Sequence, residues 1–288
     1  MKRRDFIANT VKTAGLISFS RFPQNVFGSE QKKYANDVVT LGNTGIKISR
    51  LAIGTGSNGW KGSSNQTRKL GLKGLSGLLN HAYDRGVYFW DSADQYGSHP
   101  HLKEALKTIP REKVVILTKT LATTEEEMKS DLDRFRNELG TDYLDIVLLH
   151  AITDPEWPIK KEPAMNILSK AREDSIIRAH GISCHSIEAL NAAANSDWVQ
   201  VDLVRYNPAG THMDDEPKIV ADVIKKMKMS GKGIVGMKVF GMGKLADRLD
   251  ECLNYHLTAD FIDATTIGIE SVDQFDDLIK RIPVASVL

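Results

Sequence analysis

The sequence has 288 residues, with 38 Lys and Arg against 37 Asp and Glu, and a formal net charge of +1. This balance gives no basic excess to attract nucleic acid, and no apolar stretch approaches the roughly 20 residues that a membrane span requires. We therefore expect neither a nucleic-acid partner nor a stable membrane span. Two cysteines are too few for a disulfide framework, and the length suits one large α/β domain or two small ones.

The first 36 residues differ in character from the rest. Arg3 and Arg4 precede Phe6 and a weakly apolar run that ends at Phe19, a pattern that resembles a twin-arginine export signal. We predict an export signal and linker over residues 1–36, with the twin-arginine translocase as partner during export and a periplasmic or exported location. The alternatives are a disordered basic N-terminus on a cytoplasmic protein and an uncleaved anchor.

The region after this leader opens with a predicted β-hairpin. Residues 38–41 and 46–48 alternate apolar and polar side chains on either side of the Gly/Asn turn 42–45. Beyond the hairpin one unit recurs about every thirty residues, the size of a βα unit: an apolar strand, a short loop and an amphipathic helix. The eight strands are predicted to end near Gly54, Asp91, Lys119, His150, Ser183, Tyr206, Lys238 and Gly268.

Eight such units predict a (β/α)8 TIM barrel over residues 37–288, with the hairpin closing one end. Capping residues and acidic first turns predict helix starts near Thr124, Ser186 and Ser271. Glycines that precede the next strand predict helix ends at Gly86, Gly140 and Gly231. An open doubly wound sheet is the rival topology. The even spacing of the units favours the barrel.

Four residues are candidates for catalysis: Asp91, Tyr96, Lys119 and His150. Three of them end apolar runs, and catalytic side chains of barrel enzymes lie at the C-terminal ends of the strands. A phenol with an ordinary pKa of about 10 is a poor proton donor at neutral pH, but an ammonium within about 4–6 Å lowers that pKa by roughly 1–3 units. Burial raises it, so Lys119 has to lie close to Tyr96. Asp91 would keep the lysine charged and His150 would hydrogen-bond a substrate oxygen, which suits proton transfer to or from an alcohol or carbonyl.

The motifs around these residues resemble those of the aldo-keto reductase family. The catalytic motifs of that family are similar to segments 91–97, 118–119 and 148–150, and its entry hairpin and first strand are similar to segments 41–49 and 54–56. The resemblance implies a (β/α)8 barrel that binds a nicotinamide dinucleotide in an extended form. It also implies a general acid/base, Tyr96, supported by Lys119, Asp91 and His150.

The resemblance further implies a set of dinucleotide-binding residues: Gly54, Thr55, Ser183, Lys238, Phe240, Gly241, Gly268, Ser271 and Gln274. The chain departs from the family pattern at three positions that orient the nicotinamide ring. Cys184 stands where an Asn is usual, Leu203 where a Gln is usual, and Lys238 where an aromatic side chain usually stacks on the ring. The Met-Lys pair that ends at Lys238 resembles a divergent branch of the family.

The last βα unit resembles the family's clamp for the adenosine phosphate. A glycine and a helix N-terminus are present to receive an anion. Members that use NADPH place a basic side chain near Glu270, whereas a carboxylate there would repel a 2′-phosphate. We therefore expect NAD(H) over NADP(H), although Lys244 could reach that phosphate from the preceding loop.

Three functional hypotheses follow. The first is an oxidoreductase that transfers a hydride between a nicotinamide dinucleotide and a small carbonyl, alcohol or sugar. A free pool of reduced dinucleotide is not expected outside the cytoplasm, so the second is a redox-neutral sugar epimerase or lyase with tightly held NAD. The third is a non-catalytic ligand-binding barrel.

Four further side chains have open or weak assignments. Trp60 and Trp157, in loops after the first and fourth strands, either form walls of a substrate pocket or pack the loops themselves. His99 and His101 lack the ligand spacing of a recognised metal site, so no metal is expected.

Overall fold

Eight parallel strands close into a barrel in the computed structural model, which describes residues 32–288. The order around the barrel is β10-β3-β4-β5-β6-β7-β8-β9, and every neighbouring pair is parallel, which confirms the predicted (β/α)8 architecture. The strands are β3 (Leu51–Gly54), β4 (Phe89–Asp91), β5 (Val115–Thr120), β6 (Leu144–Ile152), β7 (Ile177–Cys184), β8 (Val201–Arg205), β9 (Gly233–Met237) and β10 (Ala264–Gly268). Residues 1–31 of the predicted leader lie outside the described residues.

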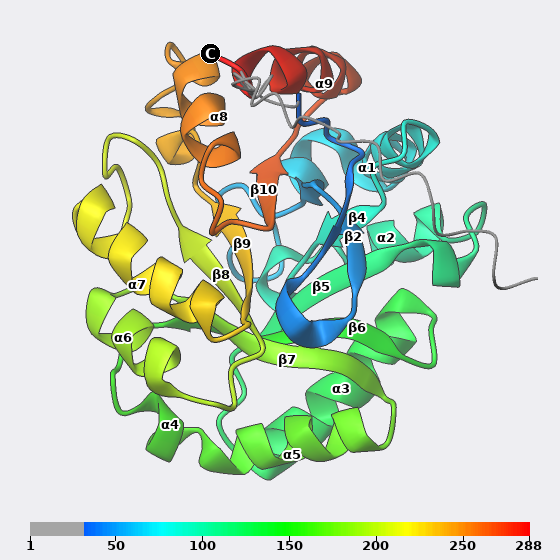
Figure 1. The fold of residues 1–288 in the computed structure, drawn as a ribbon. Helices are drawn as coiled ribbons and strands as arrows, with labels where there is room; N and C mark the ends of the chain where they lie inside the picture. The colour runs from blue at the N-terminus through cyan, green and yellow to red at the C-terminus, as the bar shows by residue number, and fades with distance from the viewer. Residues whose placement is uncertain (1–31) are drawn as a thin grey trace, which may run out of the picture. The chain divides into compact units, whose positions relative to one another are not determined.

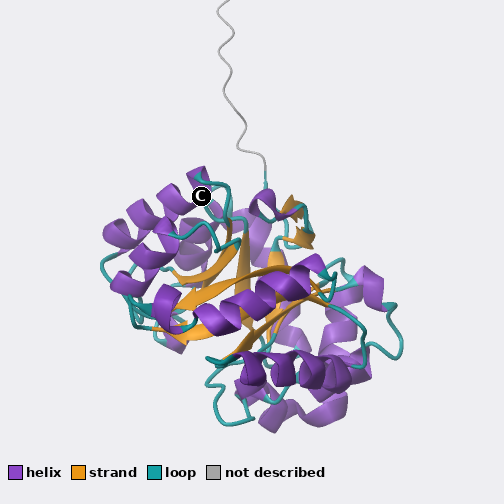
Figure 2. Cartoon of the chain, turned by 90° about the horizontal axis from the view of Figure 1, so that it is seen from below, coloured by secondary structure: helices purple, strands orange, loops and turns teal. Residues whose placement is uncertain are grey.

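Helices surround the strands, as Figures 1 and 2 show, and bury their apolar faces against the outside of the barrel. Within residues 32–288, no helix is both long enough and apolar enough to span a membrane. The helices are α1 (Asn65–Asp84), α2 (His99–Ala105), α3 (Glu125–Leu139), α4 (Trp157–Lys160), α5 (Glu162–Glu173), α6 (Ile187–Asn195), α7 (Pro217–Met229), α8 (Leu249–Leu257) and α9 (Val272–Ala285).

Local sequence signals account for the helix ends. The hydroxyl of Thr124 accepts a hydrogen bond from the backbone of Glu127, whose side chain returns the contact as a capping box. Ser186 and Ser271 cap α6 and α9 in the same position. Gly140 ends α3 with a φ of +68°, a conformation that favours glycine. The predicted starts and this predicted end are confirmed.

The N-terminal hairpin closes one end of the barrel. Its strands β1 (Val38–Thr40) and β2 (Lys47–Ser49) pair antiparallel and are blue in Figure 1. Ile46 and Ile48 are buried in the same apolar cluster as the barrel interior. The backbone N–H of Asn43 donates to the carbonyl of Gly231, just before β9, at 2.8 Å. The hairpin therefore plugs the N-terminal end of the strands and leaves the C-terminal end for chemistry.

The barrel interior changes from apolar to polar along five of the eight strands. Side chains of a strand alternate between its two faces, so the residue two positions beyond a buried interior side chain also points inward. Phe89, Leu117, Leu148, Leu203 and Ala264 all belong to the buried interior cluster. Two positions after them, at the C-terminal mouth, stand Asp91, Lys119, His150, Arg205 and Thr266.

Candidate active site

Lys119 lies at the centre of the polar mouth. Its side chain is 0% exposed, and its Nζ donates hydrogen bonds to Oδ1 of Asp91 and, at 2.7 Å, to the carbonyl of Ser92. The second carboxylate oxygen of Asp91 accepts a hydrogen bond from Thr266 Oγ1 at 2.8 Å. An isolated buried ammonium costs several kcal/mol, and this paired carboxylate with its own donors offsets that cost. The site is therefore built around one buried ion pair.

Tyr96 is presented to this ion pair by a short 3-10 helix, Asp94–Tyr96. Lys119 Nζ lies 4.8 Å from the centroid of the phenol ring. Arg134, on α3, donates to Asp94 Oδ1 at 2.6 Å and holds the short helix in place. The ring rests on bare backbone, because an added Cβ would lie 2.1 Å from Cε2 at Gly56 and 2.3 Å from Cδ1 at Gly59. No larger residue fits beneath the phenol at those two positions.

His150 reaches the mouth at an irregularity in β6. The pairing of β6 with β7 shifts between Leu149 and Ile152, and Ala151 has a φ of +55°. Bulges of this kind at a barrel rim re-aim a side chain. The imidazole lies edge-on to the Tyr96 ring, with centroids 5.7 Å apart. Its Nδ1 is buried and makes no hydrogen bond within the described chain.

Burial and charge set the protonation states of these groups. Burial raises the pKa of Tyr96 above its ordinary value, and the charge of Lys119 opposes that shift without reversing it. Burial lowers the pKa of Lys119, but Asp91 and Tyr96 outweigh it, so the amine stays an ammonium. Burial and the charge of Lys119 hold the pKa of His150 well below its usual range. Lys119 therefore acts on the phenol in the expected direction, but burial outweighs it and Tyr96 remains a proton donor at neutral pH.

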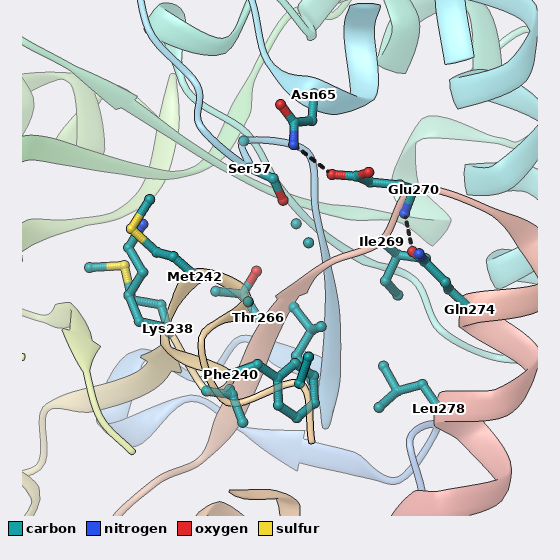
Figure 3. Close-up of a pocket in the computed structure, with 18 of the residues that line it drawn as sticks. Ser57, Asn65, Lys238, Phe240, Met242, Thr266, Ile269, Glu270, Gln274 and Leu278 are labelled. Atoms are coloured by element: carbon teal, nitrogen blue, oxygen red, sulfur yellow. Dashed lines mark hydrogen bonds between the residues drawn. The ribbon is translucent and has the colours of Figure 1, made fainter. Parts of the chain in front are cut away.

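A cavity of about 480 Å³ runs from this site to the first turns of α9. Asp91, Tyr96 and Lys238 line one part of it, and Glu270 and Gln274 line another. In Figure 3 Lys238 and Met242 lie on one side and Glu270 and Gln274 on the other. The cavity thus connects the proton-transfer residues with a helix N-terminus, where backbone N–H groups favour an anion.

The predicted cofactor residues divide into two groups by position. The first group lines the cavity and comprises Gly54, Lys238, Phe240, Gly268 and Gln274. The second group does not line it. Thr55 hydrogen-bonds the Asp91 carbonyl and Ser98, and Ser271 caps α9. Ser183 is buried near the end of β7, and Gly241 packs against Thr211. For the second group, contact with a cofactor stays a prediction.

The two tryptophans predicted to flank a substrate have different environments. Trp157 is 1% exposed at the start of α4, packs against Trp198 and donates its indole N–H to the Ala189 carbonyl. It does not line the cavity and is packed as the second alternative expected, so a contact with substrate stays a prediction. Trp60 is 57% exposed in the loop after β3, beside the glycines under Tyr96, and its role stays a prediction.

Several site residues escaped the sequence-based prediction. Thr266 braces Asp91, and Met237 ends β9 inside the cavity, next to Lys238. The two-residue alternation of the strands could have indicated that both side chains point into the barrel. Thr266 stands two positions before Gly268, and Met237 stands two positions after the interior residue Val235. Nothing local in the sequence indicated Asn65, whose amide reaches Glu270 at 2.8 Å across 205 residues.

Comparisons with known proteins give the family and the fold. The model of the "Aldo/keto reductase family" matches residues 50–279. An aldo-keto reductase of Alternaria alternata is 25% identical over 254 residues, covering 73% of this chain and 67% of the relative. D-threo-aldose 1-dehydrogenase of a Pseudomonas species is 25% identical over 235 residues, covering 70% and 69%. The solved holo form of an aldo-keto reductase from Bacillus halodurans shares the fold, with a TM-score of 0.70, 16% identity and coverage of 88% and 91%.

Proposed function

The chain belongs to the aldo/keto reductase family, and from that premise we propose that it moves a hydride between a nicotinamide dinucleotide and a small carbonyl or alcohol. Members of the family are NAD(P)-dependent oxidoreductases that act on carbonyl substrates. In this proposal Tyr96 is the general acid/base. The relative named for D-threo-aldose supports sugars as one class of substrate.

The observation that carries the proposal is the fully buried Lys119 between Asp91 and the ring of Tyr96. A carbonyl being reduced needs a proton on its oxygen, and the protonated phenol supplies it. The ammonium then stabilises the phenolate left behind, because it lies against the ring and carries the opposite charge. The neutral imidazole of His150 donates a hydrogen bond that holds the substrate oxygen beside the phenol. Asp91 keeps the lysine charged and fixed.

The residues that line the cavity fit a dinucleotide. The N-terminus of α9, on the side of the cavity opposite Lys238, is a partner for phosphate oxygens. Phe240 and Met237 offer apolar surface to a planar ring. Such a group, when bound, supplies the hydride that no amino-acid side chain can provide.

Glu270 supports a preference for NAD(H) over NADP(H). Burial raises the pKa of its carboxyl, but hydrogen bonds from Lys69 and Asn65 outweigh burial and keep the group ionised. Figure 3 shows the contact with Asn65, and the backbone N–H of Glu270 donates to the Gln274 side chain. A carboxylate in this position accepts a hydrogen bond from a ribose hydroxyl and occupies Lys69, which is then not available to a 2′-phosphate. We propose NAD(H) on that ground.

We also propose that residues 1–36 direct export through the twin-arginine translocase, with the barrel from residue 37 onward as the exported domain. The paired arginines at positions 3 and 4 support this. A reporter fused after residue 36 should leave the cytoplasm, and the same fusion with Arg3→Lys and Arg4→Lys should remain inside. Equal export of both fusions would exclude this pathway.

The test of the proposed activity is turnover of NADH or NADPH with a panel of small aldehydes, ketones and sugars. We expect oxidation of the dinucleotide, and Tyr96→Phe should abolish it because the phenylalanine has no proton to donate. Turnover of a sugar without added dinucleotide, by protein that retains NAD, would instead indicate a redox-neutral epimerase or lyase. Binding of NADH with no turnover of any carbonyl would indicate a ligand-binding barrel.

A further inference from the structure

Three neighbouring strand ends present nitrogen-bearing side chains to the same part of the mouth, and burial lowers the pKa of one of them, His185, to about 4, so that it is neutral at pH 7. His185 directly follows β7, Arg205 ends β8, and Lys238 directly follows β9. Arg205 is the Cα partner of Met237 in the β8–β9 register. Lys238 therefore stands one position beyond Arg205 along the neighbouring strand. The β7–β8 register, with Ile182 opposite Asp202, brings His185 level with Arg205 on the other side.

Arg205 points into the barrel mouth. Val201 and Leu203 on the same strand belong to the interior cluster, so the two-residue alternation turns Arg205 to the same face. Nε and Nη2 of its guanidinium both donate to one oxygen, Oδ1 of Asp214. Its Nη1 donates to no residue in the range 32–288. One edge of the guanidinium is thus fixed, and the other is available to an anion.

One carboxylate, Asp214, offsets part of the charge of Arg205 but leaves the Nη1 edge of its guanidinium free. Asp214 is occupied by Arg205, and Asp91 is occupied by Lys119. Asp202 lies on the outer face of β8 and is fully buried there, where burial raises the pKa of its carboxyl well above the usual range. Lys238 has no ion-pair partner within the described residues, and burial, followed by the charges of Arg205 and Lys119, lowers its pKa. The charge of Lys238, which acts on His150, and the free Nη1 edge of Arg205 therefore remain for an anion in this part of the mouth.

We propose that Arg205 forms a subsite for the carboxylate of an acidic carbonyl substrate, with the charge of Lys238 adding to the attraction. The inference rests on the proposed function, since it names the substrate class of the same site. Arg205 does not line the cavity assigned to the dinucleotide, whereas Lys238 does. Arginine binds carboxylates through paired N–H groups, and a substrate so anchored would place its carbonyl between the phenol and the imidazole.

The experiment compares 4-carboxybenzaldehyde with 4-carbamoylbenzaldehyde, which has the same shape and no charge. We expect kcat/KM to favour the carboxylate about tenfold or more, chiefly through KM, as for a charge-assisted contact. Arg205→Gln should bring the ratio close to one. Arg85→Gln, at the C-terminal end of α1, is the matched control and should leave the ratio as it is. Arg205→Gln leaves the buried carboxylate of Asp214 without its partner. The double variant Arg205→Gln with Asp214→Asn therefore tests whether the kcat/KM ratio also falls when no unpaired carboxylate is left behind.

Two results would overturn the subsite. One is an equal kcat/KM for both aldehydes in the unaltered protein. The other is a rise in the KM of the dinucleotide in Arg205→Gln with an unchanged ratio, which would assign the arginine to the cofactor pyrophosphate. If neither aldehyde turns over, the proposed activity fails separately. Calorimetric titration with 4-(hydroxymethyl)benzoate and its amide then decides the subsite, and only tighter binding of the acid that depends on Arg205 supports it.

Discussion

The two ends of the cavity hold their charges in different ways. At the catalytic end Lys119 is 0% exposed and Asp91 is braced by a strand hydroxyl on β10. At the α9 end Glu270 pairs with Lys69, whose side chain is 60% exposed. A buried pair is costly to break because it leaves a stranded charge, whereas an exposed pair contributes roughly 0–1 kcal/mol. The difference indicates that the ion pair beside Tyr96 is fixed by burial, while the proposed cofactor preference rests on contacts that a single substitution can change.

Lys119→Met should have the largest effect, because it strands the buried carboxylate of Asp91 and removes the charge beside the phenol. We expect kcat to fall by a factor of about 10²–10⁴ and the free energy of unfolding to fall by about 3–5 kcal/mol. Steady-state kinetics and urea unfolding measure the two. Lys69→Met at the other end is the matched control, with an expected loss of at most about 1 kcal/mol. Similar losses in both variants would remove the contrast between the two ends.

The pH profile tests the catalytic end without a substitution. Burial raises the pKa of Tyr96 and lowers that of His150, so between about pH 6.5 and 9 the phenol is protonated and the imidazole neutral. We expect kcat for carbonyl reduction to stay level across that window and to fall only as the pH rises through the pKa of the phenol. Alcohol oxidation, which needs the phenolate, should rise with pH over the same window. A reduction rate that already falls below pH 9 would mean that Lys119, rather than burial, sets the acidity.

Thr266→Val should have a smaller effect on the same end. It removes the hydrogen bond to Asp91 Oδ2 and keeps the shape of the side chain. A hydrogen bond to a charged group contributes about 1.5–3 kcal/mol, so kcat should fall about tenfold or more while the KM of the dinucleotide changes little. Thr266→Ser should restore most of the rate. Thr265→Val, on the same strand but bonded to His256, is the control and should keep the rate of the unaltered protein.

Glu270→Gln should have the smallest effect, and it tests whether the α9 end sets the preference between NADH and NADPH. Without the carboxylate, Lys69 is free to meet the 2′-phosphate of NADP(H). We expect the ratio of kcat/KM for NADPH over NADH to rise about fivefold, in line with an exposed contact. Asp277→Asn removes another cavity carboxylate, further along α9, and should leave the ratio nearly unchanged. A preference for NADPH in the unaltered protein would contradict the proposed cofactor.

The fold and the catalytic end were largely predictable because they depend on local patterns. The buried strands recur about every thirty residues. Three of them end at the predicted residues Gly54, Asp91 and Gly268, and the others end within two residues of their predicted positions. The alternatives for Trp157 stayed open because sequence does not reveal that its loop forms a helical turn packed against Trp198. The contact of Asn65 with Glu270 joins distant segments, and such a pairing depends on closure of the barrel rather than on any neighbour in sequence.

The glycines at positions 56 and 59 have a consequence for how this chain can diversify. Loops at a barrel mouth ordinarily tolerate substitution, and they are where new specificities arise. Here the phenol contacts the main chain of that loop at both glycines, so even a methyl group would displace it. A library randomised across residues 55–63 should therefore return variation around both positions and none at either of them. The turn is constrained by what lies on top of it, although it contributes no reacting atom of its own.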